Sequence, residues 1–194
     1  MQNEINEDII EQFIASAKEA VATVERIPAN ANSLNDALVE ATENEMVLLA
    51  QPDDLDPELF SIFKLNINVV IEPTKEQLAT IKIGITDAFC AIASTGSICV
   101  SITKNLTSPA SMLTRKHIVI VDSKTIIPKP RNIFSEKYLE GKGLKRSFSI
   151  ITGPSATADM GPLVRGVHGP GKLHIIIVDL PTGQAGLPTG RQGS

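Results

Sequence analysis

The residue types best suited to chemistry lie between positions 153 and 171, a stretch rich in Gly, Pro, Ser, Thr and Asp. Ser155, Thr157 and Asp159 alternate with alanines, and in an extended segment this alternation places all three polar side chains on one side. Two hydroxyls and a carboxylate in that arrangement could position a polar substrate. The same side chains could instead satisfy loop amides, so the pattern leaves both interpretations open.

The second half of this stretch reads RGVHGPG, residues 165–171. A histidine among glycines is exposed and can donate a proton, accept one or bind a metal, so His168 is a candidate for acid–base chemistry. Arg165 could bind an anion through paired hydrogen bonds. The alternative is that His168 is a turn residue bonded to the backbone. A Ser155–His168–Asp159 triad can also be drawn, but a loop does not fix the geometry that a triad requires.

A third candidate is the run Thr95, Gly96 and Ser97, expected between a helix and a strand. Glycine there permits a positive φ and close approach of a ligand to the backbone. The flanking hydroxyls could bind a carboxylate or phosphate oxygen. A tight turn with a left-handed glycine explains the same three residues without a ligand.

Other chemistries are disfavoured by what the sequence lacks. It contains no HExxH, no GxSxG, no EF-hand spacing and no closely spaced cysteine pair, so we expect no metal site and no nucleophile elbow. Cys90 and Cys99 lie inside apolar runs, which predicts two buried thiols in a reducing cytoplasm. His117 and His174 also lie inside apolar runs and are expected to be strand histidines with satisfied hydrogen bonds.

Composition is that of a globular soluble protein, with 42% hydrophobic and 21% charged residues. Aromatics make up 4%, too few for stacking on nucleic-acid bases, and no apolar run is long enough to span a membrane. Charge is uneven, because residues 1–60 hold 14 acids and 2 bases while the remainder holds 8 acids and 16 bases. This asymmetry indicates either solvated faces or an acidic segment that docks on a partner or on its own basic body.

The hydrophobic periodicity predicts an amphipathic helix over residues 4–26 and a second helix from an N-cap at Ser33 to Glu43. Together they would form an acidic helical arm, residues 1–45. Short apolar strands then alternate with short helices over residues 46–180, including a helix at 86–93 and a buried central strand at 173–178. This alternation predicts an α/β fold with a mixed, mostly parallel sheet. Residues 181–194, rich in Gly and Pro, are expected to be disordered.

Three blocks of the chain resemble the lactate-utilisation protein C family, whose domain is the LUD domain. They are GITDAFCAIASTGSICV at 84–100, MLTRKHIVIV at 112–121 and GPSATADMGPLVRGVHGPGKLHIIIVD at 153–179. The blocks occur in order and cover roughly residues 81–180. The last block is long and specific, and it contains the candidate loop described above.

The resemblance implies a three-layer α/β/α fold like that of phosphosugar isomerases and CoA transferases. It also implies a cytoplasmic protein of bacterial lactate catabolism that works beside iron–sulfur proteins to oxidise L-lactate to pyruvate. The chain has no cluster motif of its own, so the iron–sulfur clusters would reside in the partners. No nucleic acid or membrane is expected as a partner, and a homo-oligomer is compatible with the fold group.

The third block departs from the family pattern at two charged positions. Ala156 stands where the family has Arg, and Gly161 stands where it has an acidic residue. Thr114 replaces a proline in the second block. Losing an Arg and an acid from one loop removes a charge pair or an anion-binding group, which leaves open whether the chain is an enzyme.

The leading hypothesis is an accessory subunit of a lactate-oxidising iron–sulfur complex. Asp159 and His168 would act as acid and base, if the chain is catalytic. A small carboxylate or phosphate-bearing ligand would be bound in one cleft, whose predicted lining is Thr95, Gly96, Ser97, Ser155, Thr157, Arg165, Gly166 and Gly169. The alternatives are a stand-alone small-molecule enzyme of the phosphosugar-isomerase or CoA-transferase type, and a non-catalytic interaction module that docks through the acidic arm.

Overall fold

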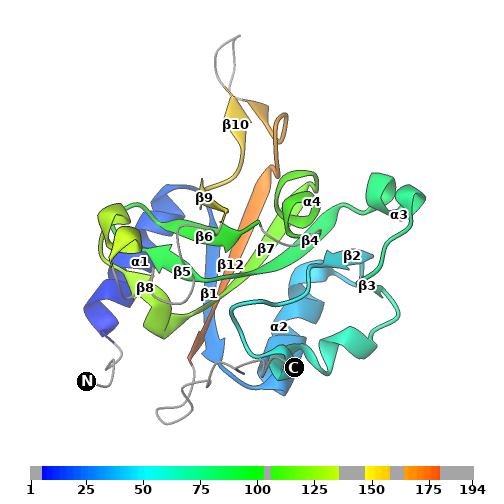
Figure 1. Ribbon diagram of the computed structural model, residues 1–194, viewed down its shortest axis with the longest axis horizontal. Coiled ribbons are helices and arrows are strands. Elements are labelled where there is room, and N and C mark those ends of the chain that lie inside the picture. The colour runs from blue at the N-terminus through cyan, green and yellow to red at the C-terminus, as the bar shows by residue number, and fades with distance from the viewer. Residues whose placement is uncertain (1–5, 103–105, 136–146, 158–163, 180–194) are drawn as a thin grey trace, which may run out of the picture.

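A computed structural model describes residues 6–102, 106–135, 147–157 and 164–179. The predicted disordered tail at 181–194 lies outside the described residues. The core of the fold is a six-stranded sheet, with helices on one face and a helix plus a second sheet on the other (Figure 1). The expected α/β class with a mostly parallel sheet is confirmed.

The six-stranded sheet is parallel throughout and has the strand order β1-β12-β7-β4-β2-β3. In chain order its strands are β1 (Thr23–Pro28), β2 (Val47–Leu49), β3 (Val69–Val70), β4 (Ile83–Ala88), β7 (Lys116–Asp122) and β12 (Lys172–Asp179). The apolar run at 173–178 forms most of β12, which pairs with β1 on one side and β7 on the other. The expectation of a buried central strand is therefore correct.

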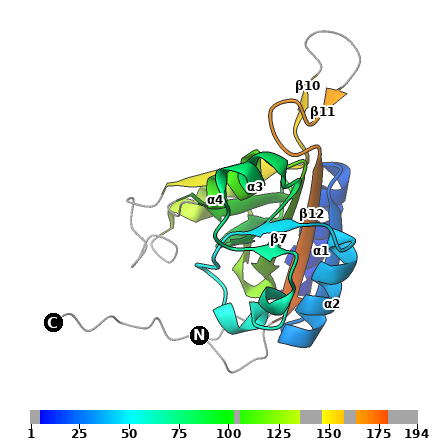
Figure 2. The same ribbon diagram turned by 90° about the vertical axis from the view of Figure 1, so that its right-hand side faces the viewer.

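The second sheet has the order β8-β5-β6-β9 and mixes parallel with antiparallel pairs. It consists of β5 (Cys90–Ile92), β6 (Ser97–Ser101), β8 (Ile126–Ile127) and β9 (Phe148–Thr152). Two further short strands, β10 (Ala156–Thr157) and β11 (Val164–Arg165), pair with each other. Figures 1 and 2 show this β10–β11 ribbon projecting from the end of the main sheet where β12 begins.

Both faces of the main sheet are covered, and its strand β12 is accordingly apolar on both faces. Ile175 and Ile177 pack against helix α1 (Glu7–Glu19) and the second sheet, while Ile176 and Val178 pack against helix α2 (Ala31–Thr42). The remaining helices are α3 (Lys75–Thr80), α4 (Thr107–Met112) and the 3₁₀ turns η1 (Pro57–Phe60), η2 (Phe63–Leu65), η3 (Ser123–Thr125) and η4 (Pro130–Phe134). None of the helices in the described ranges combines the length and hydrophobicity that crossing a bilayer requires.

The helix expected over residues 4–26 is wrong at its C-terminal end. Helix α1 ends at Glu19, and Val21 adopts a left-handed φ of 68° that turns the chain. The following residues form β1, which pairs in parallel with β12 from Thr23 to Pro28. A long-range strand pairing thus overrides the local helical period. The acidic segment therefore contributes a strand to the main sheet and buries Phe13 of α1 in its core.

Two other local expectations are also corrected. Residues 86–93 form the end of β4 and strand β5 instead of a helix, with every residue from 83 to 93 buried. A segment buried on all sides shows no amphipathic period, so its sequence does not distinguish helix from strand. Helix α2 is capped by the side chain of Asn30, which accepts a hydrogen bond from the Ser33 backbone N–H at 2.8 Å, and Ser33 lies inside the helix.

Helix α4 packs directly on the backbone of β4. A Cβ added at Gly84 would lie 1.9 Å from the Ala110 carbonyl oxygen, so only glycine permits this contact. Helix α4 ends beside β7, and Thr114 closes this end by donating a hydrogen bond to the Ala110 carbonyl at 2.9 Å. Thr114 therefore has a structural role, and α4 is held where it can line a pocket.

Candidate functional site

A pocket of about 490 Å³ lies where β7 and β12 begin, beside α4 and β9. We call it the histidine pocket, because it brings His117 and His168 together. Its other lining residues are Ser111, Met112, Ile150, Ile151, Thr152, Gly153, Pro154, Ser155, Ala156, Gly169, Pro170 and Leu173. This volume suits a small organic molecule, and the lining combines apolar side chains with polar groups that could orient a ligand.

His117 is a buried titratable group of this pocket, with 1% of its surface exposed. Its Nε2 is hydrogen-bonded to the Thr86 hydroxyl at 2.9 Å, while its Nδ1 has no partner among the residues that the structure describes. Burial lowers the pKa of His117 to about 3, so the ring is neutral at physiological pH. A neutral imidazole held at one nitrogen presents the other as a single donor or acceptor, according to its tautomer.

The loop between β11 and β12, residues 166–171, forms one wall of the histidine pocket. Gly166 has a φ of 79°, and a Cβ there would lie 3.3 Å from Gly171, so the two ends of the loop nearly touch. Ser155 fixes the loop from outside, because its N–H donates to the Pro170 carbonyl at 2.8 Å and its carbonyl accepts from the Gly166 N–H at 2.9 Å. The exposed His168 and the tip of the loop are thereby held against the pocket.

A chain of hydroxyls reaches the pocket from the second sheet. The Thr95 and Ser97 hydroxyls are 2.6 Å apart, and the Ser97 and Thr152 hydroxyls are 2.7 Å apart. Thr152 lines the pocket, whereas Thr95, Gly96 and Ser97 do not. Of the three residues predicted there, Thr95 and Ser97 are therefore connected to the pocket by hydrogen bonds that run through the Thr152 hydroxyl.

Gly96 has a structural function. Its φ is 62°, and a Cβ at this position would lie 2.2 Å from the backbone nitrogen of Ala17 in α1. The residue makes the tight turn between β5 and β6 and lets the helix approach it. Of the two interpretations of Gly96, the turn is the one that the geometry matches.

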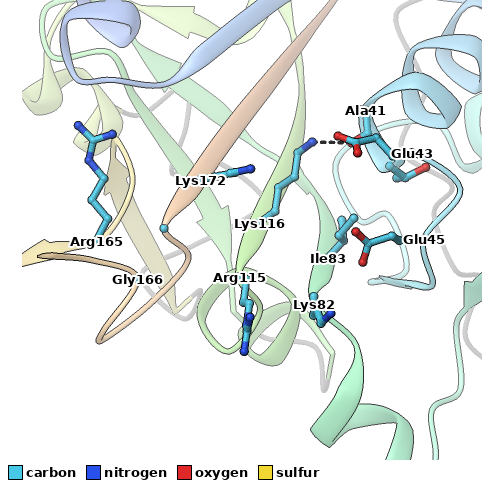
Figure 3. Close-up of a pocket in the computed structure, with 12 residues that line it drawn as sticks. Ala41, Glu43, Glu45, Lys82, Ile83, Arg115, Lys116, Arg165, Gly166 and Lys172 are labelled. Carbon is cyan, nitrogen blue, oxygen red and sulfur yellow. Dashed lines mark hydrogen bonds between the residues drawn. The ribbon is translucent and has the colours of Figure 1, made fainter.

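The predicted residues divide between two pockets instead of sharing one cleft. Ser155, His168 and Gly169 line the histidine pocket, whereas Arg165 and Gly166 line a second pocket of about 350 Å³. We call the second one the basic cleft (Figure 3), and it is lined by the two ends of the loop, Gly166 and Gly171, whereas the middle of the loop lines the histidine pocket. Asp159 and the Thr157 side chain lie outside the described residues, so their predicted roles stay predictions.

Sequence reasoning assigned His117 and His174 the same structural role, and only one of them has it. The His174 ring is bonded at both nitrogens, Nδ1 to the Thr23 hydroxyl at 2.7 Å and Nε2 to Glu25 at 2.8 Å. His117 is bonded at one nitrogen, and it lines the pocket. Both are strand histidines in the sequence, so no local signal separates them. Among the described residues, no group of three His, Cys, Asp or Glu side chains could hold a metal ion.

Comparison with known families assigns the chain to a protein family. Residues 9–178 match the family model of the LUD domain, and the chain belongs to this family. The match begins within α1, so it includes the segment predicted as a separate acidic arm. The family resemblance predicted from the three sequence blocks is confirmed.

Curated relatives carry the name lactate utilization protein C. The protein from Bacillus licheniformis is 33% identical over 101 residues, which make up 50% of this chain and 42% of that protein. The protein from Bacillus subtilis is 32% identical over 100 residues, with the same coverage of 50% and 42%. The matched part thus spans less than half the length of these relatives.

A solved structure has the same fold. The crystal structure of a DUF162 family protein from Deinococcus radiodurans covers 88% of this chain and 96% of its own, with a TM-score of 0.66 and 20% sequence identity. At this level of identity the similarity concerns the fold alone. The finer likeness to phosphosugar isomerases and CoA transferases stays a prediction.

Proposed function

We propose that this chain is a cytoplasmic component of L-lactate utilisation, which binds a small carboxylate in the histidine pocket and supports the oxidation of L-lactate to pyruvate by iron–sulfur partner proteins. The observation that carries the proposal is that Ser155 and His168, both from the family's loop block, line one pocket with the buried His117. The relatives named lactate utilization protein C support the choice of pathway.

The chemistry of the pocket suits recognition of a hydroxy or keto acid. His168 can hold a carboxylate as an imidazolium or through a neutral N–H, and the Ser155 hydroxyl can donate to the same group. The unpaired Nδ1 of His117 offers a second, uncharged contact for a hydroxyl or carbonyl oxygen. The Nδ1 atom of His117 disfavours analogues of the acid that lack this hydroxyl or carbonyl oxygen, because the buried nitrogen would then stay unsatisfied.

The departure at Ala156 bears on catalysis. Ala156 lines the histidine pocket at the position where the family has Arg, so the pocket of this chain lacks that cation. We infer that the electrons of lactate oxidation pass to iron–sulfur centres in partner chains, and that this chain acts by binding and positioning. The chain would then be an accessory subunit, and its partner proteins would contain the iron–sulfur clusters.

The direct test measures L-lactate and pyruvate binding to the purified chain by calorimetry. We expect saturable binding that His168→Ala and Ser155→Ala each weaken by about tenfold, the loss of one charge-assisted hydrogen bond. Ser61→Ala, an exposed serine outside the pocket, is the matched control and should bind as the wild type does. Equal affinity in all four proteins would contradict the assignment of the pocket.

The cellular test deletes the gene and measures growth on L-lactate as sole carbon source. Growth should fail and be restored by the wild-type gene but not by the His168→Ala variant. Purification of the tagged chain should also recover cysteine-rich iron–sulfur proteins. Unchanged growth of the deletion strain would refute the role in lactate utilisation.

A further inference from the structure

The basic cleft is separate from the histidine pocket and differs from it in charge. Its cations are Lys82, Arg115, Lys116, Arg165 and Lys172, and its acids are Glu43 and Glu45. Figure 3 shows the Lys116 and Lys172 side chains pointing toward the end of α2, while Arg165 lies on the far side of Lys172 and Arg115 points away from α2. Among the described residues that line the cleft, positive charge exceeds negative charge by three.

The register of the sheet assembles this cluster. Lys116 is the Cα partner of Lys172 on β12 and of Ile83 on β4, so the first residues of three neighbouring strands lie in a row. Backbone bonds fix the row, since the Arg115 N–H donates to the Lys82 carbonyl at 2.7 Å and the Lys172 N–H donates to the Arg115 carbonyl at 3.2 Å. The cations thus stand on a rigid edge of the sheet.

One of the five cations has a structural partner. Lys116 donates a hydrogen bond to the Ala41 carbonyl at 2.5 Å, at the C-terminal end of α2 where the helix dipole is negative. Within the described ranges, Lys82, Arg115, Arg165 and Lys172 form no ion pair. Five cations held together with two acids repel one another, and a bound anion would relieve that repulsion.

We propose that the basic cleft binds a small oxyanion carrying two or more negative charges, either a phosphate compound or a polycarboxylate. The size of the cleft, about 350 Å³, suits a small molecule. Glu43 and Glu45 on the far wall would repel an extended acidic surface such as a nucleic-acid backbone, but a compact anion on the strand side avoids them. The cleft is a second site, and monovalent lactate does not fill it.

The test titrates the whole chain with pyrophosphate and, separately, with citrate at constant ionic strength, by calorimetry. We expect saturable binding of at least one probe, and the preferred probe shows whether phosphate or carboxylate is the source. Lys172→Gln and Arg115→Gln should each weaken binding by about tenfold. Lys75→Gln, an exposed lysine on α3, is the matched control and should leave binding unchanged.

Three outcomes would overturn the proposal: no saturable binding of either probe, equal weakening by Lys75→Gln, or loss of binding in His168→Ala. The third outcome would place the anion in the histidine pocket. Because the His168→Ala variant tests the proposed lactate site and Lys172→Gln tests the cleft, failure of one assignment is distinguishable from failure of the other. Thermal unfolding of each variant verifies that it is folded.

Discussion

The histidine pocket and the basic cleft are lined by different parts of the loop at 166–171, and they differ in burial and in charge. The pocket contains a neutral, fully buried imidazole among apolar side chains, whereas the cleft exposes lysines and arginines to solvent. A buried neutral group selects a ligand by geometry and hydrogen bonding. An exposed cationic row selects by charge and is screened by salt. One loop thus lines two sites with different modes of recognition.

The largest expected effect concerns the helix that lines only the histidine pocket. Gly84→Ala would place a methyl group 1.9 Å from the Ala110 carbonyl and force α4 from its position. We expect a loss of about 3 kcal/mol in the free energy of unfolding, measured with urea, together with weaker L-lactate binding and unchanged pyrophosphate binding.

The matched control for that change is Gly169→Ala. Its Cβ would lie 3.2 Å from the Ser155 Cβ, a contact that a small shift of the loop accommodates, and we expect a loss of about 1 kcal/mol. Equal stability of Gly84→Ala and the wild type would show that α4 does not depend on this contact.

The next effect distinguishes the buried histidine by its pH dependence. The pKa of His117 is about 3 in the folded chain, below its ordinary value of 6.5. As the pH falls below about 6.5, the unfolded chain takes up a proton that the folded chain does not. The stability that the neutral ring contributes is therefore lost progressively down to about pH 3. We expect the wild type to lose about 2 kcal/mol between pH 7 and pH 5 through this group.

A His117→Gln variant isolates this contribution, because glutamine does not titrate. Asp87 and Asp122, whose pKa values are raised by burial, titrate in both proteins and cancel in the difference. Urea unfolding at several pH values should show a flatter profile for the variant between pH 7 and pH 5. Parallel profiles would mean that the ring is protonated in the folded chain.

A smaller effect separates the structural lysine of the cleft from its neighbours. Lys116→Met removes the hydrogen bond to the Ala41 carbonyl, and we expect a loss of about 1 kcal/mol in unfolding free energy. Lys172→Met, next to it in the row, should cost less than about 0.5 kcal/mol. If both lysines cost the same, Lys116 has no special role at the end of α2.

The smallest effect concerns the cation on β11. Arg165 is exposed, so Arg165→Gln should change the unfolding free energy by less than about 0.5 kcal/mol in thermal or urea unfolding. We expect weaker pyrophosphate binding and unaltered L-lactate binding, because Arg165 lines the basic cleft and does not line the histidine pocket. Weaker binding of both ligands would show that the loop couples the two sites.

The contrast between the two sites also explains what the sequence could predict. The histidine pocket depends mainly on a contiguous block, so Ser155, Gly169 and His168 were recognisable from one stretch of sequence. The basic cleft depends on the pairing register of β4, β7 and β12, which brings Lys82, Lys116 and Lys172 together. No local sequence pattern specifies that register. His117 was missed for a related reason, since its place in the pocket depends on residues from several distant segments of the chain.

The same distinction holds for the fold. The runs at 117–121 and 173–178 were predicted as strands because they are short, apolar and β-branched. Residues 23–26 were misassigned to a helix because their partner strand, β12, lies about 150 positions away and only the pairing makes them a strand. Local chemistry therefore specified β7 and β12, whereas the edge strand β1 and the fully buried segment at 86–93 depended on long-range contacts.

The strand order has a consequence for how the chain is made. β12 lies between β1 and β7, yet it is synthesised after both of them. On the ribosome, β7, β4, β2 and β3 can associate early, while β1 and α1 have no place in the sheet. The edge strand can dock only once residues 172–179 have left the exit tunnel and inserted beside β7. Completion of the sheet is thus a late, non-local event, of the kind that folds slowly and exposes an unpaired edge to other chains in the meantime.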